Sequence, residues 1–219
     1  MNHYPAPINP RKPGMIGAAF WNLRLIVNLT SIKIAILIFL LLPFSPACSS
    51  DKLSSLLGQV ESLNISRGGY TLGKALTDSQ KATALKHPEE AANPLTFKFK
   101  DGDLHVVADK ATDRVVIFYE RYEAATIKKV QALVGDLTLD FGDPTVMAHD
   151  KIVYWAFGPE GKLSEEQYRN DKEVKKKLNI LATVKLNSDI KIVGKSDLSK
   201  VGNIYFIISS EPVLKLMSP

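Results

Sequence analysis

The sequence predicts an α+β protein in which an antiparallel sheet packs against one long amphipathic helix and several shorter helices. Alternation of apolar and polar residues over 95–100, followed by a turn signal and a second apolar stretch to 108, is typical of a β-hairpin. The apolar period changes to that of a helix over 124–139. A run of nine apolar residues, 34–42, predicts a signal or anchor segment ahead of this domain.

Most of the net positive charge of the chain comes from its first 47 residues. The 219 residues are 45% hydrophobic and carry a formal net charge of +5. Four of the 28 basic residues and none of the 23 acidic residues lie in 1–47, which leaves 24 basic and 23 acidic residues in the rest. A nearly neutral body gives no electrostatic reason to expect a nucleic acid partner.

The leader follows the order of an export signal. A basic segment ends at Lys33, and Ile34–Leu42 is apolar throughout. Nine residues cover only about half of a ~30 Å hydrocarbon core, so this run is too short to span a membrane alone. Pro43 and Pro46 end any helix that forms there.

The sequence Ser45-Pro46-Ala47-Cys48 resembles the end of a bacterial lipoprotein signal, in which small residues precede a lipidated cysteine. The resemblance implies that residues 1–47 are removed and that acyl chains such as palmitate anchor Cys48. Cys48 is the only cysteine, and a free thiol is unfavourable in an oxidising compartment. Two or more acyl chains are enough for stable anchoring.

The resemblance also implies a location in the cell envelope, facing the periplasm. Ser49, in place of Asp, favours the outer membrane over the inner membrane in such lipoproteins. Two alternatives remain: an uncleaved anchor over 25–44, and ordinary cleaved export without a lipid. The long basic segment also leaves Met15 open as the true start.

The chain after the signal divides into a tether with a short helix at 48–64 and one α+β domain at 65–219. A small helix is expected at 77–86, where Thr77 or Asp78 can serve as the N-cap.

The clearest local structure is a hairpin with strands at 95–100 and 103–108. Asp101-Gly102 is a strong signal for a two-residue turn. This turn would pair Phe99 with Leu104, Phe97 with Val106, and Leu95 with Ala108, all on one face.

An interior strand is predicted at 113–122, because its centre is apolar on both faces. The helix at 124–139 follows, and Gly142 and Pro144 end it. Its apolar stripe consists of Ile127, Val130, Val134 and Leu137, with Leu133 beside it.

The C-terminal third predicts a return to strands. Residues 151–157 form one strand, and a charged helix begins after Ser164. The apolar stretches at 180–194 and 203–209 supply two or three closing strands.

Residues 133–158, "LVGDLTLDFGDPTVMAHDKIVYWAFG", resemble part of a known family. An amphipathic helix, then Phe-Gly-Asp-Pro, then an aromatic-rich strand is similar to SmpA/OmlA-type outer-membrane assembly lipoproteins, whose domains share a β-lactamase-inhibitor-like fold. "YTLGKALTDSQKATAL" (70–85) is similar to the start of such a unit. The resemblance implies an interaction protein rather than an enzyme.

No motif of the domain predicts catalysis, a cofactor or a metal. His87, His105 and His149 lack the spacing of zinc ligands. No nucleophile elbow and no phosphate-binding loop is present. Lys175–Lys177 is flanked by acidic residues and is expected on a solvated helix rather than at nucleic acid.

Tyr154 and Trp155 are the candidate interaction surface. Neighbouring residues of a strand point to opposite faces, so only one of them can enter the layer that packs on the main helix. The sequence therefore predicts a non-catalytic cell-envelope lipoprotein that binds a protein or another envelope component. The alternative is an exported hydrolase or small-ligand-binding protein whose site the sequence does not reveal.

Overall fold

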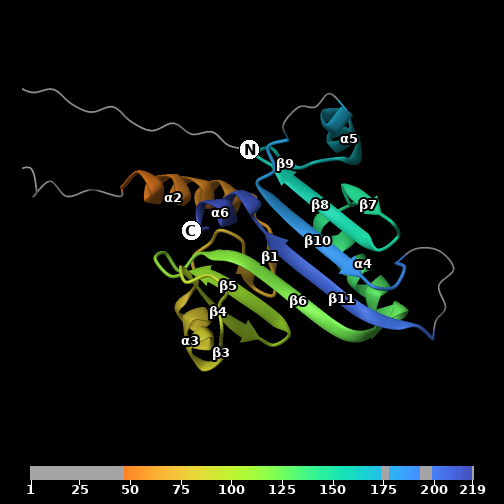
Figure 1. Ribbon diagram of the computed structural model, residues 1–219, viewed down its shortest axis with the longest axis horizontal. Helices are drawn as coiled ribbons and strands as arrows, with labels where there is room; N and C mark the ends of the chain where they lie inside the picture. The colour runs from red at the N-terminus through yellow and green to blue at the C-terminus, as the bar shows by residue number, and fades with distance from the viewer. Residues whose placement is uncertain (1–46, 174–177, 193–198, 219) are drawn as a thin grey trace, which may run out of the picture. The chain divides into compact units, whose positions relative to one another are not determined.

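An antiparallel sheet forms the centre of the fold (Figure 1). The structure, a computed structural model, describes residues 47–173, 178–192 and 199–218. Most of the predicted signal peptide and the Lys175–Lys177 segment lie outside these residues. Within them the protein is α+β, as the sequence predicts.

The sheet of the described residues has nine strands in the order β3-β4-β5-β6-β11-β10-β8-β7, and β9 pairs with β8. All neighbours are antiparallel. The first half contains β3 (Pro88–Glu89), β4 (Thr96–Asp101), β5 (Leu104–Asp109) and β6 (Val115–Thr126). The second half contains β7 (Val146–Ala148), β8 (Ile152–Gly158), β9 (Gly161–Lys162), β10 (Ala182–Ser188) and β11 (Val201–Ser209).

Five helices and a small hairpin surround this sheet in the described residues. The helices are α2 (Ala47–Ser62), α3 (Asp78–Lys86), α4 (Ile127–Phe141), α5 (Glu165–Glu173) and α6 (Glu211–Leu216). The hairpin consists of β1 (Ser66–Arg67) and β2 (Tyr70–Thr71). The predicted strands at 113–122, 151–157 and 203–209 and the helices at 77–86 and after Ser164 are present. The described residues of the stretch 180–194 contain one strand, β10, and α6 was not predicted.

The crossover through α4 determines the strand order. The chain leaves β6, passes along α4 and enters the far edge of the sheet at β7. β8, β10 and β11 then return toward β6, and β11 closes the sheet against it. Segments that are far apart in the sequence therefore become neighbours in the middle of the sheet.

The helix α4 forms where its stripe and its caps predict. Thr126 caps its N-terminus, and Gly142, with φ 71°, ends it. Ile127, Val130, Leu133 and Leu137 are buried, whereas Val134 is half-buried. α3 begins at the predicted N-cap Thr77, which forms a capping box with Gln80.

The predicted hairpin is present, but its predicted register was wrong by two residues. Asp101 pairs with Leu104, and Phe99 pairs with Val106. The tip is therefore Gly102-Asp103, with φ 60° at Gly102, and a glycine at the first loop position is typical of a type II′ turn. A shift of two residues leaves every side chain on its predicted face, because strands alternate with period two.

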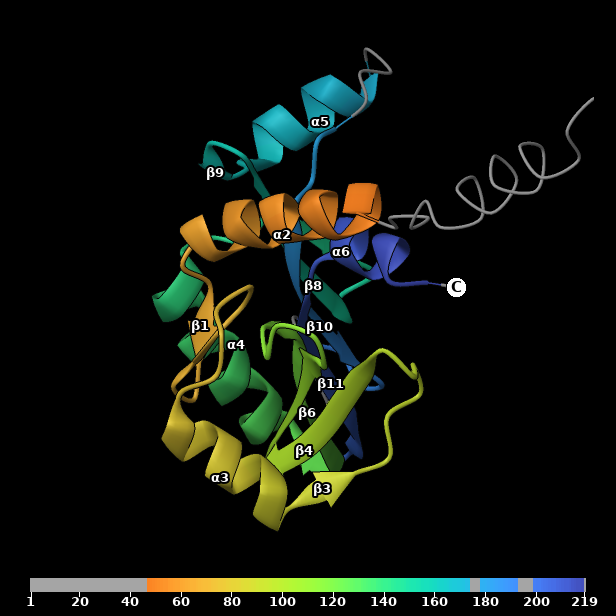
Figure 2. The same ribbon diagram turned by 90° about the vertical axis from the view of Figure 1, so that its left-hand side faces the viewer.

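One face of the sheet forms the main core with α4. Six directly paired residues, one from each of six neighbouring strands, have 0% exposure: Phe99, Val106, Phe118, Ile208, Val184 and Trp155. In Figure 2, α4 and β1 lie on the same side of the sheet. This face is closed by the protein's own helices.

The helix α2 belongs to the domain. Leu57 and Val60 are buried in the hydrophobic core, and α2 packs against α6. The segment expected to hold a tether and a short helix is thus helical from Ala47 to Ser62. No helix in the described part of the chain is long and apolar enough to cross a membrane.

Candidate functional site

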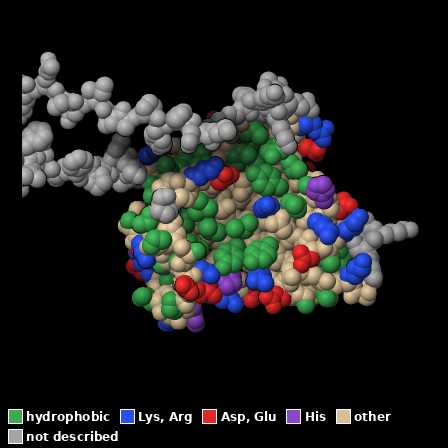
Figure 3. All heavy atoms as spheres, viewed as in Figure 1, with side chains coloured by type: hydrophobic (Ala, Val, Ile, Leu, Met, Phe, Trp, Pro, Cys, Tyr) green, Lys and Arg blue, Asp and Glu red, His purple; other side chains and the backbone are tan. Residues whose placement is uncertain are grey.

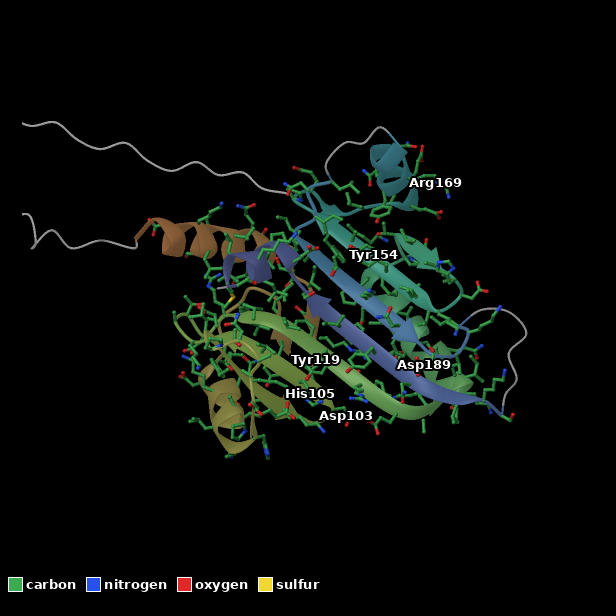
Figure 4. All side chains as sticks on the ribbon, viewed as in Figure 1. Asp103, His105, Tyr119, Tyr154, Arg169 and Asp189 are labelled. Atoms are coloured by element: carbon green, nitrogen blue, oxygen red, sulfur yellow. The ribbon has the colours of Figure 1, made fainter. Side chains whose placement is uncertain are left out.

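The face of the sheet opposite α4 carries a second continuous row of side chains. We call this row the open face: Lys100, His105, Tyr119, Ile207, Lys185, Tyr154 and Val146. Each residue is directly paired with the next, and together they cross seven neighbouring strands. Figure 4 shows His105, Tyr119 and Tyr154 on the strands that face the viewer.

The two residues predicted as an interaction surface lie on opposite faces of β8. Trp155 is fully buried, and its indole Nε1 donates a hydrogen bond to the carbonyl oxygen of Gly142 at 2.8 Å. Trp155 therefore belongs to the core and not to the surface. Tyr154 is half-buried on the open face, where its ring meets Tyr168 of α5 edge-to-face at 6.2 Å.

Tyr154 is held in its neutral form. Burial raises the pKa of Tyr154 to about 12, and the nearby Tyr168 and Glu211 act in the same direction. The hydroxyl of Tyr154 therefore stays protonated at neutral pH. It offers a hydrogen-bond donor at the end of the open face near α5.

Two neighbouring side chains pack against the ring of Tyr119 on the open face. The imidazole of His105 stacks on its ring, with centroids 4.6 Å apart and an interplanar angle of 7°. The ammonium of Lys98 lies 5.6 Å from the same ring centroid. Glu89 binds both neighbours, with its Oε2 2.7 Å from His105 Nδ1 and 3.1 Å from Lys98 Nζ.

The charges of this cluster support one another. Hydrogen bonding to Tyr119 and Glu89 raises the pKa of Lys98, although burial opposes the shift. Burial acts to raise the pKa of Glu89, but hydrogen bonds with His105 and Lys98 outweigh it, and the pKa is lowered. Both side chains are therefore charged at neutral pH, and they fix the orientation of Tyr119.

A second aromatic anchor stands in the row beside the open face. Tyr205 of β11 is 41% exposed, and it is directly paired with Arg121 of β6. The guanidinium of Arg121 lies 5.5 Å from the Tyr205 ring centroid, a cation–π contact. The contact holds an exposed aromatic ring in place without covering it.

Lys185 lies on β10, an interior strand of the open face. Its direct neighbours across the strands are Ile207 and Tyr154. The side chain is half-buried, and within the described residues it forms no ion pair or hydrogen bond. Figure 3 shows that hydrophobic side chains gather over the middle of this face, with Lys and Arg side chains among them.

A polar pocket of about 750 Å³ lies on the helix side of the sheet. It lies between the β1–β2 turn and the end of α4, and Phe141 and Phe157 supply apolar lining. Arg67 lines it from β1 and is 3.3 Å from both Glu120 of β6 and Asp140 of α4.

The charged groups of this pocket are bonded to one another. Glu120 is 8% exposed and accepts a hydrogen bond from Tyr122 at 2.6 Å as well as one from Arg67. Burial and the Glu120 carboxylate raise the pKa of Tyr122 well above its usual value, so Tyr122 remains the donor. The guanidinium of Arg67 also lies over the Phe206 ring at 5.3 Å. The network ties β1 to the sheet and leaves few free polar groups for a ligand.

The three histidines of the domain lie apart from one another. His105 is on the open face, His87 is the C-cap of α3, and His149 is exposed between β7 and β8. His149 and Asp150 have φ of 53° and 55°, which a type I′ hairpin turn requires at both central positions. In the described parts of the chain, no three His, Cys, Asp or Glu side chains are grouped to hold a metal ion.

The sequence pointed to Tyr154 but not to Tyr119, Lys185 or Tyr205. The alternation within β6 and β11 was readable, since Tyr119 and Tyr205 each stand between residues with buried side chains. Their grouping depends on the placement of β11 between β6 and β10, which no local pattern encodes.

Comparison of the chain with protein-family models, with curated proteins and with solved structures gives no match. The resemblance of residues 133–158 to SmpA/OmlA-type domains therefore stays a prediction. The candidate site rests on the geometry of the open face itself.

Proposed function

We propose that this protein is a non-catalytic lipoprotein of the cell envelope that binds a protein partner through the open face. The observation that carries the proposal is the row of aromatic, aliphatic and basic side chains, half-buried or exposed, that crosses seven strands. Its opposite face is already closed by α4. Tyrosine and arginine in fixed orientations are typical anchors of protein interfaces.

The short outer strands of the sheet make the open face a better contact surface than the sheet edges. The outer strands β3 and β7 are two and three residues long, and β9 covers a further part of β8. Short edge strands leave few free backbone groups to pair with another chain. A partner therefore meets side chains rather than an open backbone ladder.

Anchoring through Cys48 completes the proposal. The lipid would be attached to Cys48, the second residue of α2 and the first of the mature chain, and the later α2 residues Leu57 and Val60 are in the domain core. The domain would then stay close to the membrane surface, on the periplasmic side. Ser49 favours the outer membrane, as in lipoproteins of this type.

The polar pocket supports a second candidate, the binding of a small ligand. Its volume of about 750 Å³ is in the range of ligand pockets, and Arg67 and Asp140 reach it. The mutual bonding of Arg67, Glu120 and Tyr122 weighs against it, since a ligand would have to displace these contacts. No hydroxyl or imidazole nucleophile lines the described pocket wall in contact with a base.

The proposal is tested by co-purification from solubilised membranes with the full chain, tagged at its C-terminus. We expect Tyr205→Ala to reduce the recovery of a specific partner by about tenfold or more, the loss of one interface anchor. Leu139→Ala is the matched control, because Leu139 is 87% exposed on α4. Equal recovery with Tyr205→Ala and Leu139→Ala would contradict a role for the open face.

Two further variants distinguish a binding function from a catalytic one. His149→Ala and Asp150→Ala remove the exposed polar residues of the β7–β8 turn. A binding protein tolerates both changes, since no single acid–base group is essential to it. A folded His149→Ala variant with a null cellular phenotype would move an active site at that turn to first place.

A further inference from the structure

Two lysines of the open face differ from the other basic side chains near it, which are paired with carboxylates. Lys98 and His105 share Glu89, and Arg121 is 3.1 Å from Glu123. Lys100 and Lys185 form no ion pair within the described residues. The seven residues of the open face therefore include two lysines that are unpaired in the described part of the chain and no carboxylate, although the chain after residue 47 is nearly neutral as a whole.

The position of Lys185 indicates which kind of partner its charge requires. A lysine at the rim of a surface is fully solvated, and its charge needs no partner. Lys185 instead lies on β10, an interior strand of the row, between Ile207 and Tyr154, and is half-buried. An ammonium group that loses more water on docking requires an anionic partner, because an unpaired charge is costly away from water.

We infer that the open face docks a protein partner whose contact segment presents carboxylates next to apolar side chains. This inference rests on the proposed function and names the chemistry of the partner. A carboxylate of the partner binds Lys185, and its apolar neighbours pack on Ile207, Tyr154 and Tyr205. Lys100 offers a second cationic contact at the β4 end of the row.

The spacing of the charges favours an acidic protein segment over a polyphosphate. Lys100 and Lys185 are separated along the row by His105, Tyr119 and Ile207, which are an aromatic stack and an aliphatic side chain. Six strand spacings of ~4.8 Å separate β4 from β7, so the row is about 29 Å wide. That width suits one side of a standard protein interface of roughly 800 Å².

Site-specific photo-crosslinking tests the inference in living cells. Tyr205 in the full chain is replaced by the photoreactive residue p-benzoylphenylalanine, and the crosslinked segment is identified by mass spectrometry. Tyr205 is suitable because it is exposed and directly paired with Asn187, two residues from Lys185. We expect a protein segment that contains Asp or Glu. The same probe at Leu139 should give no such product.

Charge variants in the same background make the test specific. Lys185→Glu should lower the crosslink yield by about tenfold or more, because like charges then meet. Lys185→Arg should retain most of the yield. Circular dichroism and thermal unfolding establish that each variant folds, and Lys185→Gln, with a smaller loss expected, serves if the glutamate variant does not.

The outcomes separate the two proposals. A partner segment without carboxylates, or a yield unchanged by Lys185→Glu, overturns the acidic partner and leaves the binding function standing. Crosslinks to lipid alone, or no crosslink from position 205 or from a second probe at 207, overturn both proposals.

Discussion

The indole of Trp155 donates its hydrogen bond to the carbonyl oxygen of Gly142, at 2.8 Å. Gly142 ends α4, and Trp155 is the β8 residue of the buried row, so this bond ties the helix terminus to the core face of the sheet. Because Trp155 points to α4, its neighbour Tyr154 must point to the open face. Trp155 is therefore a structural residue of the core, and Tyr154 is the neighbouring aromatic residue that a partner can contact.

The packing of α4 makes a prediction with an internal control. Leu133 is 3% exposed and lies on the core stripe, whereas Leu139 in the same helix is 87% exposed. Leu133→Ala should lower the free energy of unfolding by about 2–4 kcal/mol through lost burial and a cavity. Leu139→Ala should change it by less than about 0.5 kcal/mol. Urea denaturation measures both, and equal effects would contradict the described packing.

Two glycines should respond to alanine in opposite directions. Gly73 has φ 80°, and a Cβ there would lie 2.6 Å from the backbone oxygen of Leu57 and 2.7 Å from the backbone nitrogen of Glu61. Gly73→Ala should therefore destabilise the domain by about 2–4 kcal/mol and loosen α2.

Gly135 is the matched control for Gly73. It lies within α4, and a Cβ there meets nothing within 4 Å. Gly135→Ala should stabilise the domain by about 0.5–1 kcal/mol, because alanine loses less backbone entropy in a helix. Thermal unfolding of the two variants beside the parent protein tests the opposite signs. A stabilising Gly73→Ala would show that α2 does not pack as described.

The Glu89 cluster predicts a dependence of stability on pH. The pKa of Glu89 is lowered in the folded state from its ordinary value of 4.5. Its contribution to stability is therefore complete above about pH 5 and is lost as the pH falls through the lower folded value. Glu89→Gln should reduce stability at pH 6 and flatten the loss of stability between about pH 5 and pH 3.

The control for Glu89 is its sequence neighbour. Glu90 is exposed and forms no ion pair or hydrogen bond within the described residues. Denaturation of Glu89→Gln, Glu90→Gln and the parent protein at several pH values compares the two positions. Parallel curves for all three proteins would contradict the charge arrangement around Tyr119.

The lipoprotein proposal predicts the chemistry of the mature N-terminus. Intact mass and N-terminal sequencing of protein from membranes should give Cys48 with attached acyl chains and no residues of the leader. Cys48→Ser should carry no acyl chain. A mature protein that begins at Met1 or Met15 would contradict cleavage and favour the uncleaved anchor over 25–44.

The sequence by itself determined the helices α3 and α4, most of the longer strands, and the buried faces of α4 and of the 95–108 hairpin. Thr126 and Gly142 bound α4, and its stripe is buried, because caps and periodicity act within a few residues. The same holds for the faces of the 95–108 hairpin. Its register was misjudged because Asp101-Gly102 and Gly102-Asp103 both satisfy a two-residue turn, and the pairing partners beyond the turn decide between them.

The tertiary structure alone decided which side chains share the candidate site. Tyr119 and Ile207 are far apart in the sequence, yet they are directly paired because α4 carries the chain to the far edge and β11 closes the sheet against β6. The same crossover determines which face of the sheet α4 covers. Trp155 is buried for this reason, and Tyr154 lies half-buried on the other face. The period of two shows from sequence that a strand has two faces. Which face remains available to a partner depends on which face a helix covers.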